Sequence, residues 1–190
     1  MIIKIDSREQ QPLPIIKENM ISGVVIDGLP FADYWCEWEP GSEKAGYNCE
    51  MPICFERKSI PDLFGTLTSG YSRFKREIER ATENGFKIVL IIEGSLSEVL
   101  AGSKHSTVKG ESIVKTLFTL WVKYDVFPVF CSNRSEMKRY IIETFEAVGR
   151  NFKPAGEKDG KTKNSRRNSF LDTWPDGSTE VGTGEEGQEI

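Results

Sequence analysis

The stretch Ile53-Cys54-Phe55-Glu56-Arg57-Lys58-Ser59-Ile60-Pro61-Asp62 is typical of a short strand that carries Glu-x-Lys and is followed by a turn and the start of a helix. Side chains of a strand alternate between its two faces, so Glu56 and Lys58 are expected on one face and Arg57 on the other. A carboxylate and an ammonium group on one face can hold a metal ion and orient an attacking water. The stretch therefore indicates a metal-dependent hydrolytic site that needs a second carboxylate.

Asp33 is the best candidate for that second carboxylate. It lies in the aromatic segment Phe31-Ala32-Asp33-Tyr34-Trp35, which favours a strand, and the turn-rich residues 39–46 lead on to the strand that carries Glu56. We therefore expect Asp33 and Glu56 on two strands joined by a long hairpin, which can bring their carboxylates together. Such a site is typical of a metal-dependent nuclease.

The composition is typical of a globular protein without a membrane span. The 190 residues are 38% hydrophobic and 28% charged, which is typical of a globular core with a polar appendage. The net charge of −4 argues against wrapping of duplex DNA through bulk charge, and leaves room for a local basic groove. No segment has the length of roughly 20 apolar residues that a membrane span needs. We expect a soluble intracellular protein, cytoplasmic or nucleoid-associated in a bacterium or virus and nuclear in a eukaryote, with no membrane partner.

The four cysteines and the one histidine exclude some kinds of site. Cys36, Cys49, Cys54 and Cys131 form no Cys-x-x-Cys pair, so reduced thiols are favoured. A zinc site built on the first three lacks a fourth ligand. His105, in a loop, is expected to be an ordinary surface residue, and a single histidine argues against nucleases that rely on several.

The remaining elements follow from hydrophobic periodicity. The apolar run Lys87–Ile92 predicts a central strand covered on both faces. Pro128 indicates either an edge position or a bulge for the last strand. Ser59-x-x-Asp62 has the form of a capping box, and Ser132 or Ser135 is expected to cap the final helix. The predicted strands are 2–5, 24–26, 31–38, 53–58, 87–92 and 126–131, and the longer helices are 71–84, 111–124 and about 135–149. This order predicts an α/β core with a mixed sheet flanked by helices.

Two sets of charged residues have both a functional and a structural interpretation. Arg73, Arg76 and Arg80 share one face of the predicted helix 71–84, which is either a solvated face or a phosphate-binding stripe. Asp6 and Glu9 follow the first strand and are either outer members of the metal site or part of a solvated loop with a helix cap.

The end of the chain has no core pattern. Residues 153–170 carry six basic and two acidic residues, whereas residues 171–190 carry six acidic residues and no lysine or arginine. We expect a nuclease domain over residues 1–152 and a disordered, charge-segregated tail over 153–190. Phe170, Leu171 and Trp174 are either a docking motif for a protein partner or part of a passive tail.

The ordered set of motifs resembles the XPF-type structure-specific endonuclease family, in its nuclease domain. That family carries Gly-Asp, a variable gap, Glu-Arg-Lys, three residues and Asp. The matching residues are Ala32-Asp33, Glu56-Arg57-Lys58 and Asp62, with Ile5-Asp6-Ser7-Arg8-Glu9, Gly70, Arg73 and Leu90-Ile91-Ile92-Glu93-Gly94 in support. Ala32 stands where the family has glycine, and we expect the small side chain to do little harm.

The resemblance implies a restriction-endonuclease-like core that cuts branched or flap DNA with Mg²⁺, for which Mn²⁺ would substitute. The implied metal ligands are Asp33 and Glu56, with Asp6 and Glu9 as secondary members. The resemblance also implies that Arg57 and Lys58 act at the scissile phosphate, that Asp62 supports the site, and that Arg8, Arg73, Arg76 and Arg80 bind DNA. It further implies a homodimer through the nuclease domain. The alternatives are a non-catalytic DNA-binding or scaffold subunit, or a related restriction-like or junction-resolving nuclease.

Overall fold

A mixed six-stranded sheet forms the centre of the computed structural model, which describes residues 1–17, 20–38 and 50–151. The predicted tail 153–190 and Cys49 lie outside the described residues. The strands are β1 (Ile2–Asp6), β2 (Gly23–Asp27), β3 (Tyr34–Glu37), β4 (Glu50–Ser59), β5 (Lys87–Glu93) and β6 (Phe127–Cys131). The helices are α1 (Ile60–Leu67), α2 (Tyr71–Glu83), α3 (Leu96–Ala101), α4 (Gly110–Tyr124) and α5 (Arg134–Asn151).

The strand order is β2-β1-β3-β4-β5-β6. Strands β3 and β4 pair antiparallel, with Tyr34 opposite Phe55, while β4, β5 and β6 run parallel. The predicted mixed sheet and the hairpin between the Asp33 and Glu56 segments are therefore confirmed. Pro128 lies in β6, the edge strand, as its missing amide hydrogen requires.

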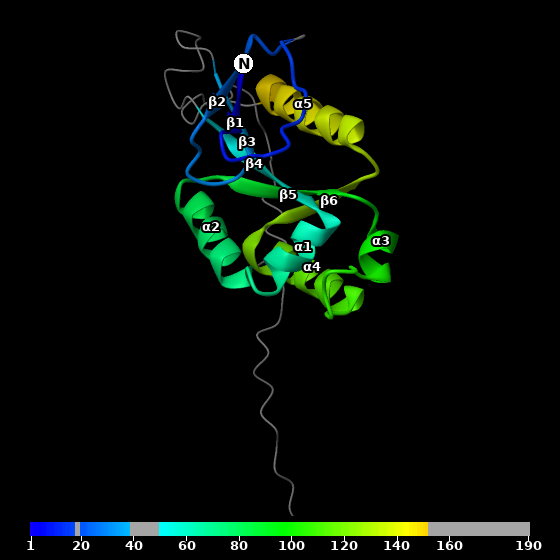
Figure 1. The fold of residues 1–190 in the computed structure, drawn as a ribbon. Coiled ribbons are helices and arrows are strands. Elements are labelled where there is room, and N and C mark those ends of the chain that lie inside the picture. Colours follow the sequence, from blue (N-terminus) through cyan, green and yellow to red (C-terminus); the bar gives the residue numbers. More distant parts are fainter. Residues whose placement is uncertain (18–19, 39–49, 152–190) are drawn as a thin grey trace, which may run out of the picture. The chain divides into compact units, whose positions relative to one another are not determined.

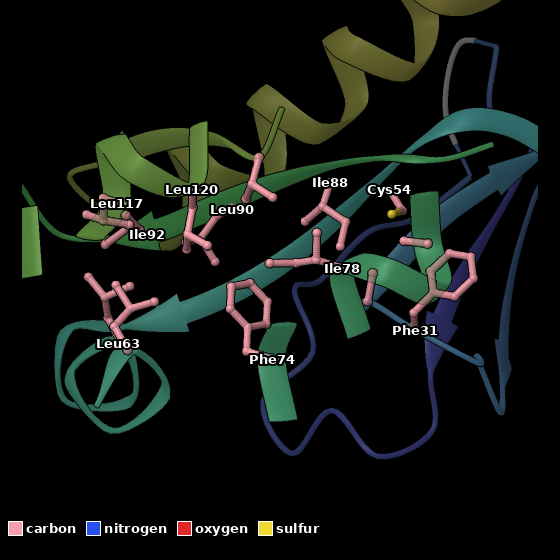
Figure 2. Close-up of a cluster of buried hydrophobic side chains, with 14 of the residues drawn as sticks. Phe31, Cys54, Leu63, Phe74, Ile78, Ile88, Leu90, Ile92, Leu117 and Leu120 are labelled. Carbon is pink, nitrogen blue, oxygen red and sulfur yellow. The ribbon is translucent and has the colours of Figure 1, made fainter. Parts of the chain in front are cut away.

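Helices cover both faces of the sheet (Figure 1). Helices α1 to α4 pack on one face, where Figure 2 shows Leu63, Phe74 and Ile78 against Leu90 and neighbouring strand residues. Helix α5 packs on the opposite face through Met137, Ile141, Ile142 and Phe145, which meet Ile3, Phe55 and Ile91. Among the described residues, no helix combines the length and apolar character needed to cross a membrane.

Strand β4 divides its side chains between these two layers. Cys54 belongs to the core beneath α1 to α4, whereas Phe55 belongs to the core beneath α5. Because the alternation continues along the strand, Glu56 and Lys58 lie on the α1 and α2 side, and Arg57 lies on the α5 side. The strand thus presents two acid–base residues to one layer and an arginine to the other, as the sequence predicted.

Two helix starts show how local chemistry sets the elements. Ser59 caps α1 by accepting a hydrogen bond from the backbone amide of Asp62 at 3.3 Å, which confirms the predicted cap. The predicted serine cap of α5 is wrong, because the side chain of Asn133 accepts from the amide of Glu136 at 2.9 Å and the helix begins at Arg134. Asparagine is at least as good a cap as serine, so the pattern alone did not decide between neighbouring polar residues.

Candidate active site

Asp33 is held against β4 by two backbone contacts. It lies immediately before β3, and its amide donates to the carbonyl of Phe55 at 2.9 Å. The amide of Arg57 in turn donates to Asp33 Oδ2 at 2.7 Å. These bonds fix the Asp33 carboxylate beside the strand segment that carries Glu56 and Lys58.

Glu56 and Lys58 form an ion pair on the same face of β4. Glu56 is buried, with 5% of its surface exposed, and the side chain of Lys58 is mostly buried. Burial by itself lowers the pKa of Lys58, but the negative charges of Glu56 and Asp33 outweigh it and the pKa is raised. The side chain of Lys58 therefore keeps its proton and its positive charge beside the two acidic groups.

The two carboxyl groups are held in a site that opposes their ionisation. Burial raises the pKa of Asp33 to about 6, despite the opposing effects of Lys58 and the Arg57 amide. Burial, followed by the charge of Asp33, raises the pKa of Glu56 to about 8. One lysine does not compensate the two carboxylates, so a bound divalent cation fits this donor set.

Glu77 on α2 is a site residue that the sequence did not predict. Its Oε1 accepts a hydrogen bond from the amide of Ala32 at 2.9 Å, and its charge contributes to the raised pKa values of Asp33 and Glu56. Glu77 thus ties α2 to the turn that places Asp33. The sequence feature that could have indicated Glu77 is its place on the helix, one turn after Arg73 and next to the buried Ile78. This place is the border between the basic and apolar faces of α2.

The conformation of Ala32 gives a physical reason for glycine at this point of the family pattern. Its φ is 58°, in the left-handed region where a Cβ atom is unfavourable. The residue is also buried, at 3% exposure, and its amide is the group that Glu77 binds. The turn before Asp33 is therefore strained in this chain, and the Glu77 hydrogen bond helps to hold it.

Asp6 and Glu9 lie near the site, but their oxygen atoms already have partners. Arg8 Nε donates to both oxygens of Asp6 at 3.0 and 2.9 Å, and these bonds lower the pKa of Asp6 although burial acts in the other direction. Glu9 Oε1 accepts from the amide of Gln11 at 2.7 Å and faces Arg57. Within residues 1–17, 20–38 and 50–151, no three or more metal-ligating side chains converge closely enough to form a cage.

The side chain of Arg57 lies on the opposite side of the sheet from Lys58. It is buried, forms an ion pair with Glu93 at the end of β5, and lies 3.5 Å from Glu9. Arg134, at the start of α5, also faces Glu93 at 3.6 Å and donates to the carbonyls of the loop after β1. The guanidinium group of Arg57 thus joins β4, which carries it, to Glu93 on β5 and to Glu9 in the loop after β1.

The other predicted residues lie around the candidate site. Asp62 is exposed and its Oδ2 accepts a 2.6 Å hydrogen bond from Ser59 Oγ, which leaves it at the start of α1 close to Lys58. Arg8 is largely exposed although it is paired with Asp6. Three further arginines are exposed on α2 and have no hydrogen bond or ion pair from their side chains within the described part of the chain: Arg73, Arg76 and Arg80.

Comparisons with known proteins agree with this geometry. The chain matches the ERCC4 domain model over residues 5–143, while no curated protein sequence matches it. XPF from Aeropyrum pernix has a TM-score of 0.54 and 20% identity, over 80% of this chain and 66% of that chain. XPF from Aeropyrum pernix in complex with DNA has a TM-score of 0.54 and 21% identity, over 78% and 64%.

This chain therefore spans about two thirds of the length of the XPF chains it resembles. At such identity the likeness shows a shared fold, which is the restriction-endonuclease-like arrangement of a mixed sheet between helices. The family model covers most of the chain, including the segment from Asp6 to Arg73. The chain belongs to the ERCC4 domain family and shares its fold with XPF from Aeropyrum pernix.

Proposed function

We propose that this chain is a metal-dependent DNA endonuclease that hydrolyses phosphodiester bonds at branched or flap DNA. The observation that carries the proposal is the grouping of Asp33, Glu56 and Lys58 on one side of β4, with two carboxyl groups whose pKa values are raised. The solved structure of XPF from Aeropyrum pernix in complex with DNA supports a nucleic-acid substrate. Mg²⁺ is the proposed cofactor, with Mn²⁺ as a substitute.

Asp33 and Glu56 would hold the metal ion, because hard cations prefer carboxylate oxygens. When bound, the ion supplies charge neutralisation at the phosphate and an activated water. In hydrolysis, the water loses a proton and its oxygen bonds to phosphorus, the bond from phosphorus to one deoxyribose oxygen breaks, and that oxygen takes up a proton. Lys58 is placed to orient the water or to offset charge on the phosphate, and its raised pKa keeps it protonated.

The remaining site residues act around this centre. Glu77 positions Asp33 through the Ala32 amide, and Arg57 positions β4 through Glu93. Asp6 and Glu9 have their partners in Arg8, Arg57 and a backbone amide, so we assign them to support of the site.

DNA binding is assigned to the exposed arginines around the site. Arg73, Arg76 and Arg80 project from α2, which also carries Glu77. Asp6 is the main cause of the raised pKa of Arg8, and the charges of Glu77 and Asp33 add to it, so Arg8 lies beside the candidate site. Phosphate binding by such side chains needs no overall positive charge, because the contacts are local. A homodimer through this domain is a further proposal that rests on the family resemblance. A protein partner for the tail is another, and it rests on Phe170, Leu171 and Trp174 as a docking motif.

The test is a cleavage assay across single-stranded, duplex, flap, fork and four-way DNA with Mg²⁺ or Mn²⁺. The parent should cut branched or flap DNA, and Asp33→Asn and Glu56→Gln should abolish cutting while circular dichroism shows a folded chain. Binding without cleavage of any form would favour the scaffold alternative, and preferred cutting of four-way DNA would favour a junction-resolving nuclease. Full activity of Glu56→Gln would overturn the proposed site.

A further inference from the structure

A polar pocket of about 570 Å³ lies between α1 and the start of α2, next to the candidate active site. Its lining includes Lys58 and Arg73 as cations, Asp62 as the one carboxylate, and Gly65, Ser69 and Gly70 as small residues. The volume is within the roughly 300–1,000 Å³ of ordinary ligand sites. Lys58 makes the pocket continuous with the face that carries Glu56.

Close contact between the two helices creates the shape of this pocket. The amide of Gly70 donates to the carbonyl of Gly65 at 2.9 Å. A Cβ atom on Gly70 would come within 3.1 Å of both that carbonyl oxygen and Thr66 Cα. Gly70 is therefore needed for the approach of α2 to α1, which has a purely structural explanation.

Gly65 has no comparable structural explanation. It lies inside α1, where glycine is less favourable than alanine. It is exposed, and a Cβ atom at this position would meet no atom within 4 Å. Nothing in the described part of the molecule excludes a side chain here, so the open space is available to a molecule outside the chain.

The charges of the pocket favour an anion. Arg73 is exposed and its guanidinium has no ion pair or hydrogen bond within the described ranges. Asp62 is occupied by its hydrogen bond from Ser59 Oγ. Lys58 supplies a second cation where the pocket borders the candidate site. An extended anion could thus contact Arg73 at one end and approach Lys58 at the other.

We propose that this pocket binds the phosphodiester backbone of the DNA strand next to the cleaved bond. Arg73 binds a phosphate near the scissile one, and Gly65 leaves room for the sugar-phosphate chain to lie against α1. The inference rests on the proposed function, because it takes DNA as the substrate and Lys58 as part of the site. It adds the location of a particular backbone contact and a role for a glycine that carries no chemical group.

The first test measures affinity for a fluorescent flap DNA with Ca²⁺ in place of Mg²⁺, so that binding is separated from cleavage. Arg73→Ala should weaken binding and reduce the slope of log K against log salt by about one, the value for one lost phosphate contact. The matched control is Arg139→Ala, which removes an arginine that is 82% exposed on α5, across the sheet. Equal effects of the two substitutions would overturn the assignment of Arg73.

The second test fills the pocket. Gly65→Leu should weaken binding at least fivefold, whereas Ser135→Leu, at an exposed position on α5, should leave it unchanged. Gly65→Ala should raise the melting temperature by a few degrees, because it improves the helix, and still weaken DNA binding. Unchanged affinity in both Gly65 variants would refute the pocket.

The third test needs no substitution at Gly65. A neutral methylphosphonate is placed in turn at each phosphate around the branch point of the flap DNA. One position should weaken binding to the parent and have no further effect on Arg73→Ala, because the contact is already lost. If one methylphosphonate position weakens binding of the parent as expected but the parent cuts no DNA with Mg²⁺ or Mn²⁺, the proposed nuclease activity is refuted and the proposed phosphate contact is supported. If the parent cuts DNA but no methylphosphonate position has this effect, the proposed phosphate contact is refuted and the proposed nuclease activity is supported.

Discussion

Replacement of Glu56 by glutamine should stabilise the metal-free protein at neutral and alkaline pH. Glu56 is buried beside Asp33, and burial together with that charge raises its pKa from 4.5 to about 8. The unfolded chain releases this proton near pH 4.5, while the folded chain retains it up to about pH 8. The folded state therefore binds more protons between these values, and its stability falls as the pH rises.

The size of this effect follows from the two pKa values. For a single group, raising the pKa from 4.5 to about 8 costs on the order of 3 kcal/mol of stability at pH 7, and nothing well below pH 4.5. Ionisation of Asp33, with a pKa of about 6, and the ion pair with Lys58 reduce the part that belongs to Glu56 alone. We therefore expect the advantage of Glu56→Gln over the parent to grow by roughly 2–3 kcal/mol as the pH rises from 5 to 8.

Urea unfolding at pH 5, 6, 7 and 8 in EDTA measures this difference. The control is Glu79→Gln, which removes a half-exposed carboxylate on α2 and should follow the pH curve of the parent. Mg²⁺ should restore stability to the parent at pH 8 and have little effect on Glu56→Gln, because a ligand stabilises only the state that binds it. A pH curve for Glu56→Gln parallel to that of the parent would refute the reasoning.

Three further substitutions test individual contacts. Ala32→Gly should raise the free energy of unfolding by about 1 kcal/mol in urea, because glycine adopts a φ of 58° without the unfavourable contacts of a Cβ atom. A lower free energy of unfolding would show that the turn at Ala32 is not strained. Glu77→Ala should reduce kcat at least tenfold, whereas Glu77→Gln, which keeps an acceptor for the Ala32 amide, should retain more activity; equal loss in both would assign the role to charge instead. Arg57→Met should lower stability by about 2–4 kcal/mol by leaving Glu93 without its buried partner, and Glu93→Gln in the same chain should recover part of it.

The features that the sequence predicted correctly depend on local physics. Alternation along β4 required only the period of a strand, and it separated Glu56 and Lys58 from Arg57. The start of α1 required only the spacing from Ser59 to Asp62. The position of β6 at the edge of the sheet followed from the missing amide hydrogen of Pro128.

The features that the sequence left open depend on contacts between distant elements. Glu77 meets Ala32 across 45 residues, and no local pattern marks that contact. Asn133 and Ser132 are both good caps, so the choice between them depends on how α5 packs. The partner of Arg57 depends on where the sheet places Glu93.

The side chains of the Glu56-Arg57-Lys58 motif do not act together at one place, as Arg57 shows. Its amide is on the strand edge that faces Asp33 and donates to Oδ2, while its side chain lies on the α5 side of the sheet and pairs with Glu93. The residue therefore contacts the Asp33 carboxylate through the backbone, and this contact is retained by any substitution other than proline. A carboxylate held by an amide and buried beside a second one is poorly stabilised when ionised, so the favourable way to complete the site is a cation from outside the chain. The loss of stability at high pH and the proposed affinity for a divalent metal ion would then have the same cause, and a substitution that removes one should remove the other.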